Sequence, residues 1–279
     1  MAVNELAQAR SLFEQALVDD SNDARANLDL GIVMEMLGDI EAAETQYRKA
    51  IAIQPDFAEA LNNLGVLLRV KRELDEAVLV LRKAVRYNPS SASGHMNLAL
   101  ALEDSALLEQ AEAEYREALR VNPNDAITRA NLGLLLLRME QRDAAARELK
   151  IALSQAADNR AALVAIGNGL RRAGEPSGAL QALQAAIRAD GAEPTPSLLS
   201  ELALAQRAAG DRDEAIRSLR RALEIDENYA IAHYLMANML AAKRASAEAA
   251  KHYQIYLQLE PKGAQAERAR ERLKLIRQQ

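Results

Sequence analysis

Small and apolar residues recur along this chain with a period of 34 residues. One alanine marks the period most clearly, with spacings of 34 residues five times in succession, then 36, then 34. Self-similarity at a fixed period of this length is typical of repeat architectures, in which each repeat packs mainly on its neighbours. The marking alanines are Ala9, Ala43, Ala77, Ala111, Ala145, Ala179, Ala215 and Ala249.

Other positions keep the same register within each period. The residue four positions after the marking alanine is Phe, Tyr or Leu, and the residue seven positions after it is Ala or Tyr. The residue twelve positions before it is Gly or Ala. Because proline cannot continue a helix, we expect helices to end shortly before the prolines that follow several periods. These are Pro55, Pro89, Pro123 and Pro261.

Each period predicts two amphipathic helices separated by a turn. In the first helix, apolar or small residues are spaced three and four apart, as in Leu61, Leu64, Gly65 and Leu68. A turn such as the one around Gly38 follows, and the second helix carries the stripe of alanines with Phe, Tyr or Leu between them. Small residues on facing helices allow two backbones to approach closely. No segment has a strand pattern, so the predicted fold class is all-α.

This pattern resembles the tetratricopeptide repeat over nearly the whole chain. The resemblance implies a right-handed α-α superhelix, a single solenoid domain over residues 1–279 with about 16 antiparallel helices. The first helices would line its concave wall and the second helices its convex wall. The expected parts are a half repeat at 1–23, full repeats at 24–57, 58–91, 92–125, 126–159, 160–193, 196–229 and 230–263, and a capping helix at 264–279.

One position departs from the family pattern. Where the family usually has Trp, at position 4 of the first helix, this chain has polar residues in several repeats. The family pattern does not predict how repeats 24–57 and 126–159 pack around Asn27 and Arg129. The residues at this position are Asn27, Leu61, His95, Arg129, Leu163, Leu199 and His233.

Composition narrows the class of protein. Hydrophobic residues make up 49%, charged residues 27% and aromatic residues 3% of the chain, so we expect a folded protein with an aliphatic, Ala-rich core. Cysteine is absent, which excludes disulfides, a thiol nucleophile and an iron–sulfur cluster. No stretch approaches the roughly 18 continuous apolar residues of a membrane helix, and the first residues lack a signal-peptide pattern. We therefore predict a cytoplasmic protein without membrane insertion, and the Arg- and Ala-rich composition suggests a bacterial origin.

The net charge of −5 is unevenly distributed. Residues 1–125 carry 12 Lys and Arg against 22 Asp and Glu, whereas residues 126–279 carry 23 against 18. This balance argues against nucleic-acid binding, which favours a basic domain. The opposite charges would orient a partner or promote a homo-oligomer through the solenoid ends. The alternative is simple variation of a solvated surface.

Side chains typical of catalysis do not group along the sequence. The three histidines lack metal-ligand spacing, and we expect His95 and His233 to lie in the core. The segment 167–169 begins like a dinucleotide fingerprint but lacks its third glycine and its preceding strand. The acidic run at 19–23 lacks the Gly and Glu of a calcium loop and predicts a turn. We therefore predict no enzymatic activity, no cofactor and no metal.

The first helices leave one face available for a ligand. Positions 2, 6, 9 and 13 of each first helix lie opposite its core-facing residues when successive residues are about 100° apart. Position 6 is Asn in three successive repeats, and position 9 is aliphatic in the same repeats. An Asn amide offers both the donor and the acceptor that a peptide group needs. The predicted peptide-binding residues are Asp29, Asn63, Val66, Asn97, Leu100, Asn131, Leu134, Arg138, Asn168 and Arg172.

This row of asparagines is similar to the asparagine ladder of O-linked N-acetylglucosamine transferases, where a tetratricopeptide superhelix binds the backbone of substrate peptides. A structural role is the alternative, with the asparagines bonded to neighbouring helices. The Lys, Asn, Asn, Lys and Arg set of the co-chaperone carboxylate clamp is missing, so we do not expect capture of a chaperone tail. Acidic residues near Asp29 and Glu59 and basic residues at Arg138 and Arg172 would orient the peptide.

Three functions are consistent with these patterns. The preferred one is a non-catalytic scaffold or adaptor that binds a peptide or helical segment of a partner protein in the concave groove. The first alternative is the substrate-recognition region of a larger enzyme, such as a glycosyltransferase. The second alternative is a self-assembling structural scaffold.

Overall fold

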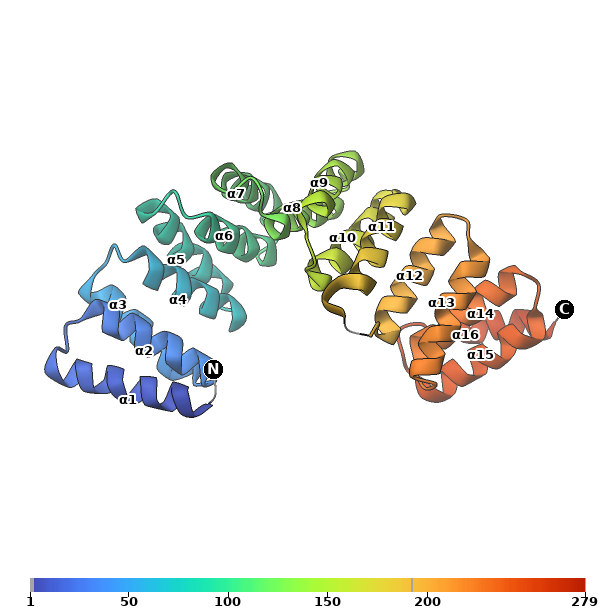
Figure 1. The fold of residues 1–279 in the computed structure, drawn as a ribbon, viewed down its shortest axis with the longest axis horizontal. Helices are drawn as coiled ribbons and strands as arrows, with labels where there is room; N and C mark the ends of the chain where they lie inside the picture. Colours follow the sequence, from blue (N-terminus) through green and yellow to red (C-terminus); the bar gives the residue numbers. More distant parts are fainter. Residues whose placement is uncertain (1–2, 192, 279) are drawn as a thin grey trace. The chain divides into compact units, whose positions relative to one another are not determined.

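The computed structural model describes residues 3–191 and 193–278 (Figure 1). These residues form sixteen α-helices and one short 3-10 helix, and none of them forms a strand. The predicted all-α fold class is thus confirmed. The helices are α1 (Val3–Asp19), α2 (Ala24–Met36), α3 (Ile40–Ile53), α4 (Ala58–Val70), α5 (Leu74–Tyr87), α6 (Ala92–Asp104), α7 (Leu108–Val121), α8 (Ala126–Arg138), α9 (Arg142–Gln155), α10 (Arg160–Ala173), α11 (Pro176–Arg188), α12 (Pro196–Ala208), α13 (Arg212–Ile225), α14 (Ala230–Ala242), α15 (Ser246–Leu259) and α16 (Ala266–Arg277), with η1 at Ala189–Gly191.

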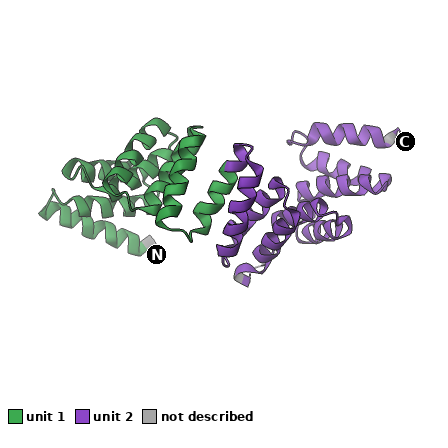
Figure 2. Ribbon diagram, turned by 90° about the horizontal axis from the view of Figure 1, so that it is seen from above, with its two compact units in different colours: residues 1–135 green, residues 136–279 purple. Residues whose placement is uncertain are grey.

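The chain divides into two compact units, Met1–Leu135 and Leu136–Gln279 (Figure 2). In the first unit, α2 pairs with α3, α4 with α5 and α6 with α7, and α1, α3 and α5 each also pack on the helix that follows them. The second unit repeats this arrangement with the pairs α10–α11, α12–α13 and α14–α15. Helix α16 then packs on α15, as a first helix packs on the second helix before it.

Close approach between paired helices explains the periodic small residues. The marking alanines from Ala43 to Ala249 are completely buried, as are the Tyr or Leu residues four positions later. A Cβ atom placed on Gly31 would lie 2.6 Å from Cε1 of Tyr47 and 3.3 Å from the carbonyl oxygen of Ala43. Ordinary contacts of this kind are longer, so a large side chain at this position would force the helices apart.

The turn inside every complete repeat has the same backbone geometry. Counted from the first residue of each repeat, the residue at position 15 has a positive φ. The backbone N–H of the residue at position 16 donates to the carbonyl oxygen of the residue at position 11 over 2.8–3.0 Å. This is the Schellman arrangement, which satisfies carbonyl groups at the end of a helix. Glycine occupies position 15 in three repeats and a residue with a side chain in four. The residues are Gly38, Arg72, Ala106, Glu140, Gly174, Gly210 and Arg244.

Polar residues at position 4 of the first helices bond to backbone carbonyls of the turn before that helix. Asn27 is buried, and its Nδ2 donates to the carbonyl oxygen of Asp23 over 2.7 Å. Arg129 Nη2 donates to the carbonyl oxygen of Pro123 over 2.7 Å, and His95 Nε2 lies 3.1 Å from the carbonyl oxygen of Pro89. Repeats 24–57 and 126–159 therefore replace aromatic packing with a side-chain hydrogen bond to the preceding turn.

Candidate functional site

The face predicted for ligand binding has a regular exposure profile. The residue at position 2 is exposed in every first helix, and the residue at position 13 is exposed in all of them except α6. Positions 6 and 9 are half-buried almost throughout. On α4, α6 and α8, all three asparagines and their aliphatic neighbours share this half-buried state, so they offer part of each side chain to solvent. These residues, which we call the amide face, are Asn63, Val66, Asn97, Leu100, Asn131 and Leu134.

Two of the predicted asparagines are linked through a third that the sequence did not single out. Asn97 Nδ2 on α6 donates to Asn62 Oδ1 on α4 over 2.9 Å, and Asn62 Nδ2 lies 3.4 Å from Asn63 Oδ1. The contact between Asn62 and Asn97 joins two successive first helices. For Asn97, the structural role that we considered as the alternative to peptide binding therefore applies, because its amide bonds to a neighbouring helix. The Asn62-Asn63 dipeptide is the only sequence signal for this bridge.

The bridge through Asn62 leaves one hydrogen-bonding group unused on Asn63 and one on Asn97. Asn63 Nδ2 and Asn97 Oδ1 make no hydrogen bond with any residue that the structure describes. One is a donor and the other an acceptor, because an Asn side chain carries an NH₂ group and a carbonyl oxygen. The face therefore offers the two complementary groups that an N–H and a C=O of an extended chain require.

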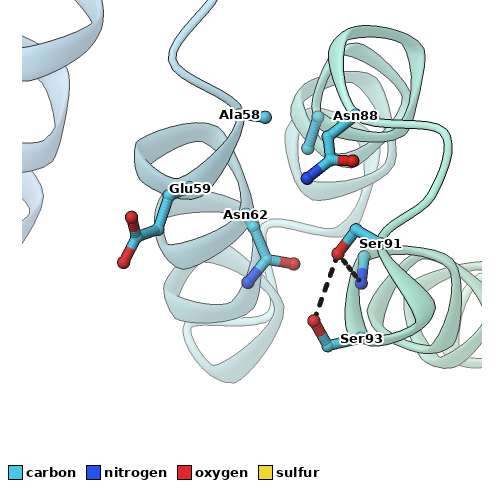
Figure 3. A pocket seen from close by; sticks show the side chains of 8 residues that line it. Ala58, Glu59, Asn62, Asn88, Ser91 and Ser93 are labelled. Carbon is cyan, nitrogen blue, oxygen red and sulfur yellow. Dashed lines mark hydrogen bonds between the residues drawn. The ribbon is translucent and has the colours of Figure 1, made fainter.

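A polar cavity of about 230 Å³ opens beside this network, in the first unit (Figure 3). Asn62 and Glu59 of α4 line one side, and Asn88, Ser91 and Ser93 at the junction of α5 and α6 line the other. Ser91 caps α6, because its Oγ accepts from the N–H of Gly94 over 3.0 Å. The cavity brings amide and hydroxyl groups together next to the bridging asparagine.

Ion pairs neutralise much of the acidic charge predicted at this face. Arg25 lies 3.2 Å from Asp29 and 2.6 Å from Glu59, and it thus joins α2 to α4. The hydrogen bond to Asp29 raises the pKa of the Arg25 guanidinium. Arg69 of α4 pairs with Asp104 of α6 over 3.0 Å. Asp29 and Glu59 are therefore not free anionic contacts for a basic peptide.

The remaining predicted residues lie in the second unit. Arg138 and Arg172 are exposed, and Asn168 is half-buried on α10. Asn168 Oδ1 is shielded from solvent without a hydrogen-bond partner among the described residues. Arg171 Nη2 lies 3.9 Å from Glu201 Oε2. The predicted set is thus divided between the two units, and among its members only Asn63 and Asn97 are joined by hydrogen bonds, through Asn62 in the first unit.

A histidine pair in the second unit was not expected from the spacing. His233 and His252 lie on paired helices with their Nδ1 atoms 2.8 Å apart, and His233 Nε2 lies 2.9 Å from the carbonyl oxygen of Glu227. Since a carbonyl only accepts, His233 carries its proton on Nε2, and His252 donates from Nδ1. Burial and the neighbouring His233 lower the pKa of His252. The described residues contain no group of three potential metal ligands.

Two family models match this arrangement of paired helices. One, described as TPR repeat, matches residues 36–69 and 203–243, and the other, described as tetratricopeptide repeat, matches residues 63–126 and 130–194. Together they cover more than half of the chain. The chain belongs to the tetratricopeptide repeat family. No curated protein matches the sequence of this tetratricopeptide repeat protein.

Solved structures share the fold of this tetratricopeptide repeat protein at low sequence identity. PilF of Pseudomonas aeruginosa is 22% identical, with 78% of this chain and 100% of that chain covered and a TM-score of 0.63. A chain of the Cut9–Hcn1 hetero-tetramer of the APC/C is 16% identical with a TM-score of 0.63, and the match covers 97% of this chain but only 52% of that one. YrrB, described as a TPR protein with an unusual peptide-binding site, is 22% identical, with 71% and 97% covered and a TM-score of 0.54.

Proposed function

We propose that this chain is a non-catalytic interaction scaffold that binds an extended segment of a partner protein along the amide face. Tetratricopeptide repeat scaffolds typically mediate protein–protein interactions. The observation that carries the proposal is the Asn62–Asn63–Asn97 network, because it leaves one donor and one acceptor beside half-buried aliphatic side chains. YrrB, which shares the fold, is described as having a peptide-binding site, and this description supports the same class of ligand.

The energetics favour an extended backbone as the ligand. Backbone groups that leave water need partners, and a typical hydrogen bond then contributes about 1 kcal/mol net. The spare groups of Asn63 and Asn97 would bond one N–H and one C=O of the peptide. Partial burial of Val66, Leu100 and Leu134 would add about 25 cal/mol for each Å² of apolar surface removed from water. Affinity would then depend little on peptide sequence at these positions, and the exposed residues at positions 2 and 13 would provide selectivity.

A peptide selection followed by variant binding tests this proposal. Peptides selected from a displayed random library against the intact chain would be measured by isothermal titration calorimetry. Changing Asn63, Asn97 and Asn131 together to Ala should weaken binding at least tenfold. The matched control is Asn22→Ala with Asn122→Ala, two exposed asparagines outside this face. N-methylation of single peptide bonds should weaken binding at one or two positions only, where an N–H meets an Asn oxygen.

Three outcomes would contradict the proposal. The first is a triple variant that binds the selected peptides as tightly as the wild type. The second is a triple variant that has lost its helical circular dichroism, because the asparagines would then serve the fold. The third is a uniform tolerance of N-methylation, because backbone groups would then make no directed bond.

A further inference from the structure

All three histidines of the chain lie in two contacts that occupy the same place in two different repeats. His95 and His233 are both buried at position 4 of a first helix. In each case one ring nitrogen lies next to a backbone carbonyl oxygen of the preceding turn, and the other lies next to a side chain 19 residues later, on the paired second helix. This partner is Glu114 for His95 and His252 for His233. The two contacts thus share their place in the repeat and differ in the partner side chain.

A proton favours the contact in the first unit. His95 Nδ1 lies 2.7 Å from Oε2 of Glu114, and its Nε2 lies 3.1 Å from the carbonyl oxygen of Pro89. A carbonyl oxygen and an ionised carboxylate both only accept, so the ring makes both bonds only when both of its nitrogens carry hydrogen. Glu117 of α7 is a second carboxylate that interacts with His95. The positively charged imidazolium therefore fits between α6 and α7.

The contact in the second unit accepts one proton but not two. His233 donates from Nε2 to the carbonyl oxygen of Glu227, and His252 donates from Nδ1 to Nδ1 of His233 over 2.8 Å. Nε2 of His252 makes no hydrogen bond with any residue that the structure describes, so it takes the first added proton. A second proton has to bind Nδ1 of His233. Two N–H groups would then point at each other at a distance that only a hydrogen bond allows.

The surroundings of His252 offer the charged ring another place. His252 is half-buried and lines a cavity of about 290 Å³, which the carboxylates of Glu224 and Glu248 also border. Both carboxylates would favour a protonated ring that turns away from His233 into this cavity. The titratable and charged groups around His252 are His233 of α14, Arg220 and Glu224 of α13, and Glu248 and Lys251 of α15.

We propose that the His233–His252 pair is a pH-sensitive contact, which holds α14 on α15 while one ring is neutral and separates when both rings are protonated. Histidines in water have an ordinary pKa of about 6.5, so the open state takes up two protons at acidic pH, whereas the closed state takes up at most one. Opening should therefore become about tenfold more favourable for each pH unit below about 6.5. The proposal concerns α14 and α15 alone and does not depend on peptide binding at the amide face.

NMR of the ring nitrogens tests the closed state directly. At pH 7, the nitrogen chemical shifts should show hydrogen on Nε2 of His233 and on Nδ1 of His252, with the three rings assigned through single His→Gln variants. Hydrogen on Nε2 of His252 instead of Nδ1 would overturn the proposal, because His252 would then not donate to His233.

Amide hydrogen exchange between pH 7 and 5 tests the opening, once the intrinsic effect of pH on exchange is subtracted. Exchange of α14 and α15 should accelerate about tenfold per pH unit below about 6.5, and exchange of α6 and α7 should not. His252→Gln should abolish the acceleration. Acceleration of the same size in this variant, or none in the wild type, would refute the proposal.

Exchanging the partner residues between the two contacts provides matched variants. His252→Glu gives α14–α15 the partner that His95 has, and the acceleration in acid should disappear. Glu114→His gives α6–α7 a histidine pair, and these two helices should then open more readily as the pH falls. If Glu114→His left the exchange of α6 and α7 independent of pH, the histidine pair would not be the cause of opening.

Discussion

Overpacking at one marking alanine tests how closely the paired helices approach. Ala111 on α7 is completely buried, and Ala113 on the same helix is exposed. Changing either one to Leu adds the same side chain to the same helix, and Ala and Leu have similar helix propensities. The two variants therefore differ only in what the added carbons meet.

The expected difference follows from the packing of the equivalent residues. In two other repeats, a Cβ on the facing glycine would lie 3.3 Å and 3.4 Å from the carbonyl oxygen of the marking alanine, so the backbones are already in contact there. Three further carbon atoms at Ala111 have no space unless α6 and α7 separate. Overpacking of this kind costs about 1–3 kcal/mol, whereas an exposed substitution such as Ala113→Leu changes stability by less than about 0.5 kcal/mol.

Urea unfolding measures this difference. The free energy of unfolding should fall for Ala111→Leu and stay near the wild-type value for Ala113→Leu. Because repeat proteins can unfold in parts, amide hydrogen exchange of α6 and α7 should be measured alongside. Faster exchange in these two helices is expected for Ala111→Leu only. Identical unfolding curves for the two variants would refute the helix approach described here.

Two further predictions concern the second unit. Burial lowers the pKa of His252 below its ordinary value of about 6.5. Between these two values the unfolded chain binds more protons than the folded chain. The free energy of unfolding should therefore fall as the pH drops below about 6.5. Among the neighbouring groups, Lys251 also lowers the pKa of His252, whereas Glu248 raises it. If the free energy of unfolding of a His252→Gln variant depended on pH between 7 and 5 in the same way as that of the wild type, this assignment would be contradicted. Removing residues 264–279 should expose the apolar side of α15 that Ala269 and Leu273 cover, so light scattering should detect aggregation, and an equally soluble truncated chain would argue against a capping role for α16.

The periodic part of the structure was accessible from the sequence. The Gly and Ala positions that let helices approach occur once per repeat, and a single misplaced residue does not hide a period of 34. Local contacts of this kind are encoded by spacing alone. The all-α fold was therefore predicted correctly, whereas the single-domain organisation, the peptide-binding residues and the cytoplasmic location stay predictions.

Contacts between side chains of different helices were not accessible in this way. The bridge from Asn62 to Asn97 spans 35 residues, and position 5 of a first helix is not a position that the helical pattern assigns to the ligand face. His233 and His252 are 19 residues apart in the sequence, and their pairing depends on how α14 and α15 are oriented relative to each other. The ion pairs of Arg25 with Asp29 and Glu59 were not accessible from the sequence either. A count of charged residues predicts an acidic surface there, whereas the structure places a guanidinium between the two carboxylates.

The positive φ at position 15 divides the repeats into two classes of local stability. Where a residue with a side chain adopts this left-handed conformation, the strain is on the order of 1 kcal/mol, and glycine avoids it. Three consecutive repeats, over residues 58–159, have Arg72, Ala106 and Glu140 in this turn. These are the repeats that carry the asparagines of the amide face. The cost of partial opening should therefore be lower there than in the glycine-turn repeats on either side, so this segment can adjust to a ligand while those repeats remain closed.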